Sequence, residues 1–117
     1  MAFRCLIVDD NHDFVTSAAQ LLGSQGVKIV GSASSTAEAL RLAGMLEPDV
    51  ALVDIELGDE DGIELSQELA ARVPATHVVL ISAYERDDLV DLLSNSPAIG
   101  FLPKRSLGVS AIERLLR

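Results

Sequence analysis

The sequence predicts an α/β fold of three layers, in which a doubly wound parallel sheet of five strands lies between helices. Five short apolar runs rich in Val and Ile do not alternate with polar residues, which is typical of strands buried on both faces. The segments between these runs repeat apolar residues at helical spacing. Strands that alternate with helices, joined by right-handed crossovers, place helices on both faces of one sheet.

The five expected strands are residues 3–8, 27–30, 50–53, 78–81 and 98–102. The order of these strands in the sheet does not follow from the pattern. Two doubly wound orders are common, and the shorter, five-stranded one suits this length better.

Each expected helix has one apolar face. The five faces are formed by Phe14, Ala18, Leu21 and Leu22; by Ala39, Leu40, Ala43 and Leu46; by Leu65, Leu69, Ala70 and Val73; by Leu89, Leu92 and Leu93; and by Ile112, Leu115 and Leu116.

Two segments predict where helices begin, and two prolines predict where helices have ended. Residues 35–38 and 110–113 both fit the capping-box pattern, with a serine followed three residues later by glutamate. Pro48 and Pro74 stand where a helix has already ended.

Composition excludes several classes of protein. The chain has 117 residues, of which 49% are hydrophobic and 23% charged, so residues 1–117 are expected to form one globular domain. No apolar run approaches the roughly 18 residues of a membrane span. The net charge of −9, without a basic cluster, argues against nucleic acid and anionic membranes as direct partners. A single cysteine and a start without a signal-peptide layout suit the reducing cytoplasm.

Polar residues follow the strands at the edge where ligands bind in an open parallel sheet. We expect five of these side chains to converge there: Asp9, Asp10, Asp54, Ser82 and Lys104. Taken singly, each has an ordinary interpretation as a helix cap, a turn residue or a surface lysine. Their joint placement after successive strands is what indicates a site.

Three carboxylates packed together repel one another unless a cation lies among them. Mg²⁺, or Mn²⁺ in its place, prefers such oxygen ligands. A carboxylate beside that cation can act as a nucleophile toward phosphorus and form an aspartyl phosphate. Lys104 and Ser82 would then contact the phosphoryl oxygens.

Five segments together resemble the receiver domain of two-component response regulators. They are Leu6-Ile-Val-Asp-Asp10, Pro48-Asp-Val-Ala-Leu-Val-Asp-Ile55, Asp61-Gly-Ile-Glu-Leu65, Val79-Leu-Ile-Ser-Ala83 and Gly100-Phe-Leu-Pro-Lys104, in the family's order across nearly the whole chain. The resemblance implies a flavodoxin-like (βα)5 fold with strand order 2-1-3-4-5.

The resemblance also implies a role for each matching residue. Asp54 would be the phosphoacceptor. Asp10 would bind the metal directly, Asp9 mainly through water, and Glu56 through its backbone carbonyl. Lys104 would neutralise phosphate charge, while Ser82 and Phe101 would be the switch residues. The phosphoryl donor would be a phosphohistidine on a sensor histidine kinase or a phosphotransfer protein.

Four positions vary within the family or depart from its pattern. Gly58 stands where proline is frequent, which suggests a more mobile loop. Arg105 follows Lys104 where proline is usual, which argues against a cis peptide there. The subgroup of the family with helix-turn-helix output domains often lacks this proline as well. The resemblance to that subgroup implies a role in transcription regulation. Glu56 and Tyr84 lie two residues past Asp54 and Ser82, and we expect them to tune the phosphoryl lifetime.

The expected function is therefore a signalling switch without an ordinary turnover substrate. Repacking would change the surface formed by the fourth helix, fifth strand and fifth helix, through which a homodimer could also form. Any output domain would lie outside this chain. Two alternatives remain: a binding module that works without phosphorylation, and a Mg²⁺-dependent phosphatase like the haloacid dehalogenases. That last class usually has aspartate two residues after the nucleophile, where this chain has Glu56.

Overall fold

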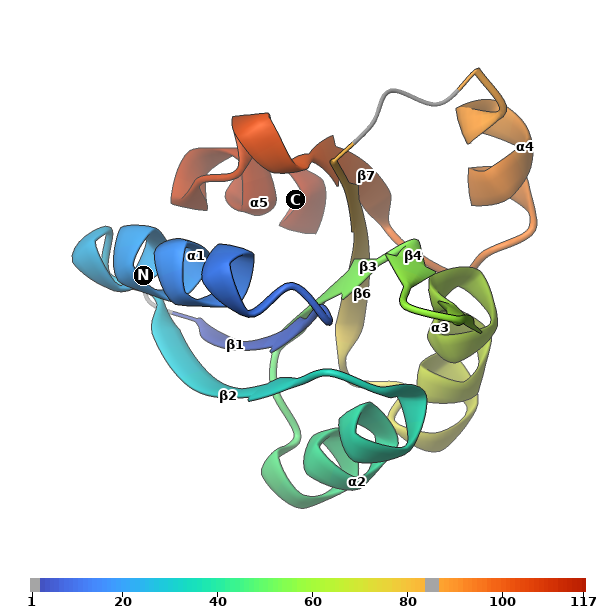
Figure 1. The fold of residues 1–117 in the computed structure, drawn as a ribbon, viewed down its shortest axis with the longest axis horizontal. Helices are drawn as coiled ribbons and strands as arrows, with labels where there is room; N and C mark the ends of the chain where they lie inside the picture. Colours follow the sequence, from blue (N-terminus) through green and yellow to red (C-terminus); the bar gives the residue numbers. More distant parts are fainter. Residues whose placement is uncertain (1–2, 84–86) are drawn as a thin grey trace.

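The predicted alternation of strands and helices is present in the computed structural model, which describes residues 3–83 and 87–117 (Figure 1). The strands of the main sheet are β1 (Arg4–Val8), β2 (Lys28–Ala33), β3 (Val50–Asp54), β6 (His77–Ser82) and β7 (Gly100–Pro103). The helices are α1 (His12–Ser24), α2 (Thr36–Leu46), α3 (Gly62–Arg72), α4 (Leu89–Ser94) and α5 (Val109–Leu116), with a 3-10 turn at Lys104–Ser106.

The sheet has the order β2-β1-β3-β6-β7, and all its pairings are parallel. Counting only these five strands, this is the order 2-1-3-4-5 of the flavodoxin-like fold, as the resemblance implied. The carboxyl ends of β1 and β3 are neighbours at the centre of the sheet. Asp9 and Asp54 are therefore brought to the same edge by the pairing of the two strands that carry them.

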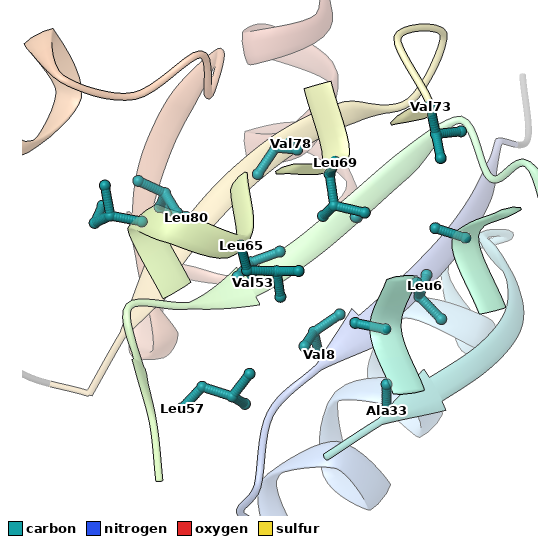
Figure 2. Packing of buried hydrophobic residues seen from close by; sticks show 14 of the residues in the cluster. Leu6, Val8, Ala33, Val53, Leu57, Leu65, Leu69, Val73, Val78 and Leu80 are labelled. Atoms are coloured by element: carbon teal, nitrogen blue, oxygen red, sulfur yellow. The ribbon is translucent and has the colours of Figure 1, made fainter. Parts of the chain in front are cut away.

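Helices cover both faces of the sheet, and each face has its own core. Helices α2, α3 and α4 pack with Leu6, Val8, Val53 and Leu80 on one face (Figure 2). Helices α1 and α5 pack on the other face. Consecutive residues of β1 enter opposite cores, because side chains alternate across a strand. This explains the continuous apolar runs of the sequence.

One helix start follows the sequence pattern and another does not. At α2, Ser35 Oγ accepts the Glu38 N–H at 3.2 Å, as a capping box requires. The expected cap at Ser110 is wrong, because α5 already begins at Val109. Its first N–H donates instead to Oε1 of Gln25, at the end of α1, over 2.8 Å. The side chain of Gln25, 84 residues away in the sequence, therefore caps α5 in place of Ser110.

The segment after β3, where Gly58 suggested a mobile loop, forms a small hairpin of β4 (Glu56–Leu57) and β5 (Glu60–Asp61). Gly58 turns this hairpin with a φ of +58°. Proline, with φ fixed near −65°, cannot adopt that conformation, so the departure from the family pattern has a backbone cause.

Every described peptide bond is trans, including those on either side of Lys104. Among the described residues, no helix is long and apolar enough to cross a bilayer.

Candidate functional site

The site lies at the carboxyl ends of β1, β3 and β7, where three aspartates and one lysine meet. One carboxylate oxygen from each of Asp9, Asp10 and Asp54 lies within 4.8 Å of the other two. Lys104 Nζ lies 2.6 Å from Asp9 Oδ2 and 3.2 Å from Asp54 Oδ2. The convergence expected from the sequence is therefore present for these four residues.

Two of the carboxylates are buried, and the backbone holds each of them in place. The side chain of Asp9 is fully buried, and that of Asp54 is 8% exposed. Asp9 Oδ1 accepts the Asn11 N–H at 2.8 Å. Asp54 Oδ1 accepts the Glu56 N–H at 3.0 Å. In both cases the donor lies two residues further along the chain, so the turn that ends each strand also orients its carboxylate.

Burial and neighbouring charge shift two pKa values in the site. Burial, with the charge of Asp9 acting in the same direction, raises the pKa of Asp54 to about 6 against the effects of the Glu56 N–H and Lys104. Burial lowers the pKa of Lys104, but contact with Asp9 and Asp54 outweighs burial, so this pKa is raised overall. The side chain of Lys104 is therefore protonated and positively charged at neutral pH.

A pocket of about 340 Å³ opens above these groups, lined by Asp10, Asn11, Asp54, Glu56, Gly58, Ala83 and Lys104. Asp9 is buried and is not one of the residues that line this pocket. Asp10 is exposed, and its carboxylate lies beside the turn at Gly58, where an added Cβ would stand 3.4 Å from Oδ2.

The residues present fit a divalent cation. Three carboxylates against one ammonium leave two excess negative charges when all four are ionised. Asp9 Oδ2 is buried and, apart from its ion pair with Lys104, has no hydrogen-bond partner among residues 3–83 and 87–117. Carboxylate oxygens at this spacing are the donors that Mg²⁺ and Mn²⁺ take. The cluster could therefore hold such an ion.

The remaining expected site residues differ in where they lie. Glu56 is exposed and lines the pocket. Ser82 is buried at the end of β6, one residue beyond Ile81, which pairs with Asp54. Phe101 is partly buried in β7 against the core of the α3 side and does not line the pocket. Tyr84 lies outside the described residues.

Sequence reasoning missed three residues that shape the site. Asn11 caps α1 and orients Asp9; an asparagine immediately before an apolar helix is a signal that could have revealed it. Phe14 places its ring under the Lys104 ammonium, 4.3 Å from Nζ to the ring centroid. Gly62 lies directly against the backbone of Asp54. Neither of the last two contacts can be read from local sequence.

Comparison with known proteins identifies the family. Residues 5–115 match the response regulator receiver domain. The response regulator GacA of Pseudomonas viridiflava is 35% identical over 97% of this chain and 53% of its own length. The transcriptional regulatory protein PdtaR of Mycobacterium tuberculosis is 32% identical over 86% of this chain and 49% of its own. The chain thus spans about half the length of these relatives.

Solved structures agree with this relationship. The signal receiver domain of the response regulator NarL from Mycobacterium tuberculosis is 31% identical, with a TM-score of 0.84 over 98% of this chain and 94% of that one. A response regulator from Burkholderia pseudomallei, crystallised with a phosphorylated aspartic acid, a calcium ion and citrate, is 27% identical, with a TM-score of 0.81 over 97% of this chain and 66% of that one. The chain described here belongs to the response regulator receiver domain family.

Proposed function

We propose that this chain is a phosphorylation-dependent switch in which Asp54 accepts a phosphoryl group. The observation that supports this most directly is the meeting of Asp54 with Asp9, Asp10 and Lys104 at one edge of the sheet. The phosphorylated aspartic acid and calcium ion of the Burkholderia relative support the same chemistry here.

Asp9, Asp10 and Asp54 would hold Mg²⁺ or Mn²⁺, together with the backbone carbonyl of Glu56. A bound divalent ion supplies positive charge to the carboxylates and to the phosphoryl oxygens. Lys104 supplies a further positive charge to those oxygens from the β7 side, since its ammonium already lies 3.2 Å from Asp54 Oδ2.

In the transfer step, a carboxylate oxygen of Asp54 attacks phosphorus. An O–P bond forms while the P–N bond to the phosphohistidine of a sensor kinase or phosphotransfer protein breaks, and the electron pair leaves with the imidazole. Water later attacks phosphorus, which releases phosphate and restores the carboxylate. The chain promotes its own modification in this way and has no ordinary turnover substrate.

The phosphoryl group on Asp54 would attract the hydroxyl of Ser82, and Phe101 would move into the space that this leaves. The surface of α4, β7 and α5 would change as a result. Helix α4 suits such a change, because it spans six residues and none of its side chains is buried. Phosphorylation would shift the population between two packings of this surface, which would bind an output domain or a second copy of the chain.

The partners of the whole protein follow from its relatives. Since GacA and PdtaR are regulators about twice as long as this chain, we propose that residues 1–117 form the receiver and that an output domain controlling transcription lies elsewhere. With a net charge of −9, the receiver itself would contact neither nucleic acid nor membrane. The protein would work in the cytoplasm, where a kinase and its ATP are available.

Incubation with acetyl phosphate and Mg²⁺, followed by intact mass measurement, tests the proposal. We expect the mass to rise by one phosphoryl group, and we expect no gain for Asp54→Asn or when EDTA is present. Asp59→Asn is the matched control, because Asp59 is an exposed aspartate in the turn of the following hairpin and does not line the pocket. Equal labelling of Asp54→Asn and the wild type would contradict the proposal and favour a module that works without this chemistry.

A further inference from the structure

The Lys104 ammonium has an aromatic neighbour as well as two carboxylate neighbours. Its Nζ lies close to Asp9 and Asp54, as described above, and 4.3 Å from the centroid of the Phe14 ring. A cation at this distance over a ring is attracted by the negative charge of the π face. The ring therefore adds an attraction to the cation that is separate from its two carboxylate contacts.

The same aromatic residue is tied to the carboxylates through the backbone. The Asn11 N–H donates to Asp9 Oδ1 at 2.8 Å, and Asn11 Oδ1 accepts the Phe14 N–H at 3.1 Å. Lys104 contacts both Asp9 and Phe14. Contacts therefore run from Asp9 through Asn11 and Phe14 to Lys104 and back to Asp9. The first turn of α1 is thereby linked to the carboxyl end of β7.

The core also restrains the ring. Phe14 is partly buried and packs against the core of α1 and α5, which includes Ala18, Leu22 and Ile112. A lysine side chain, by contrast, has a flexible four-carbon stem with several accessible rotamers. The ring thus offers a fixed surface against which a mobile ammonium can be held.

We propose that Phe14 is a positioning residue for phosphoryl transfer, which holds the Lys104 ammonium where it meets the phosphoryl group arriving at Asp54. This inference rests on the proposed function. Addition of the phosphoryl group changes the contact between Asp54 and Lys104, but the ring contact depends on neither carboxylate oxygen and persists through the step. A ring at this place therefore keeps the ammonium aligned before and after transfer.

The test compares Phe14→Leu, which removes the ring but keeps an apolar side chain, with Phe14→Tyr, which keeps the ring. Phe3→Leu is the matched control, because it removes a ring from the same core at the opposite end of β1. We expect the rate constant for labelling by acetyl phosphate and Mg²⁺ to fall about 3- to 10-fold in Phe14→Leu, or about 0.7–1.4 kcal/mol. It should stay within about 2-fold of wild type in the other two variants.

A second readout needs no metal and no phosphoryl donor. The chain has two lysines, and Lys28 is exposed on the edge strand β2. In a proton NMR spectrum, a ring beneath the ammonium shifts the CεH₂ protons of Lys104 upfield of those of Lys28. We expect this shift to persist in Phe14→Tyr and Phe3→Leu and to disappear in Phe14→Leu.

Three results would overturn the inference. The first is a Phe14→Leu protein that is labelled at the wild-type rate. The second is equal slowing in Phe14→Leu and Phe3→Leu, which would indicate a general packing effect. The third is the absence of an upfield shift in the wild type, which decides the matter even when Phe14→Leu does not fold. Failure of the wild type to take up any phosphoryl group would instead defeat the proposed function, and the inference with it.

Discussion

Gly62→Ala is the substitution for which the structure gives the most specific expectation. Gly62 is buried at the start of α3, and its N–H donates to the Ile55 carbonyl at 2.9 Å. A Cβ added there would overlap the carbonyl oxygen of Asp54 and lie 2.9 Å from both the carbonyl carbon of Asp54 and Cα of Ile55. All three atoms belong to the backbone, so no side-chain rotation can relieve the contact.

The expected loss of stability follows from the rigidity of these backbone atoms. Overpacking in a core costs about 1–3 kcal/mol, and immovable neighbours place this case at the upper end. The better helix propensity of alanine offsets at most about 1 kcal/mol. We therefore expect Gly62→Ala to lower the free energy of unfolding by about 2–3 kcal/mol. We also expect at least about tenfold slower phosphorylation, because the backbone that carries the proposed phosphoacceptor must move.

Urea denaturation and the rate of labelling by acetyl phosphate measure the two effects. Gly44→Ala is the control, since Gly44 is exposed in α2 and no atom lies within 4 Å of an added Cβ. We expect Gly44→Ala to raise stability by up to about 1 kcal/mol and to leave the labelling rate unchanged. A Gly62→Ala protein with wild-type stability and a wild-type labelling rate would contradict both expectations.

Three further predictions concern the charged site and the lifetime of the phosphoryl group. The pKa of Asp54 rises on folding from 3.8 to about 6, so the stability contributed by its neutral form is complete below pH 3.8 and is lost as the pH rises to about 6. In EDTA, Asp54→Asn should therefore unfold like the wild type near pH 4 and be more stable than the wild type at pH 7; a difference that does not change with pH would contradict this. Lys104→Met removes the cation from between Asp9 and Asp54, and we expect urea melts in EDTA to show a loss of about 1–3 kcal/mol. An unchanged melting profile would show that the ion pairs contribute nothing. Tyr84→Ala should shorten the phosphoryl half-life measured by decay of radiolabelled protein, because a bulky side chain two residues past Ser82 would shield the acyl phosphate from water; an unchanged decay rate would oppose that role.

The sheet could be predicted from the sequence because its strands are buried on both faces. Continuous apolar runs such as Cys5–Val8 have few other interpretations when helical segments lie between them. The order of the strands came only from the family resemblance. The convergence of Asp9, Asp54 and Lys104 did not need that order, because each residue stands where a parallel strand ends.

Long-range contacts between side chains could not be predicted in this way. Gln25 caps α5 from the end of α1, and Phe14 lies beneath an ammonium 90 residues further along the chain. Neither contact leaves a local pattern, because the first depends on how α1 and α5 pack together and the second on how α1 packs beside the turn after β7. The hairpin turned by Gly58 was missed for another reason: its strands have two residues each, which is too short to show a periodicity.

In the proposed switch, one carboxylate among the three, that of Asp54, takes up the phosphoryl group. Labelling with acetyl phosphate, reduction by borohydride and peptide sequencing by mass spectrometry test it directly, since reduction converts an aspartyl phosphate to homoserine. We expect homoserine at position 54 and unchanged aspartate at positions 9 and 10. Homoserine at any other position, with intact Asp54, would contradict it.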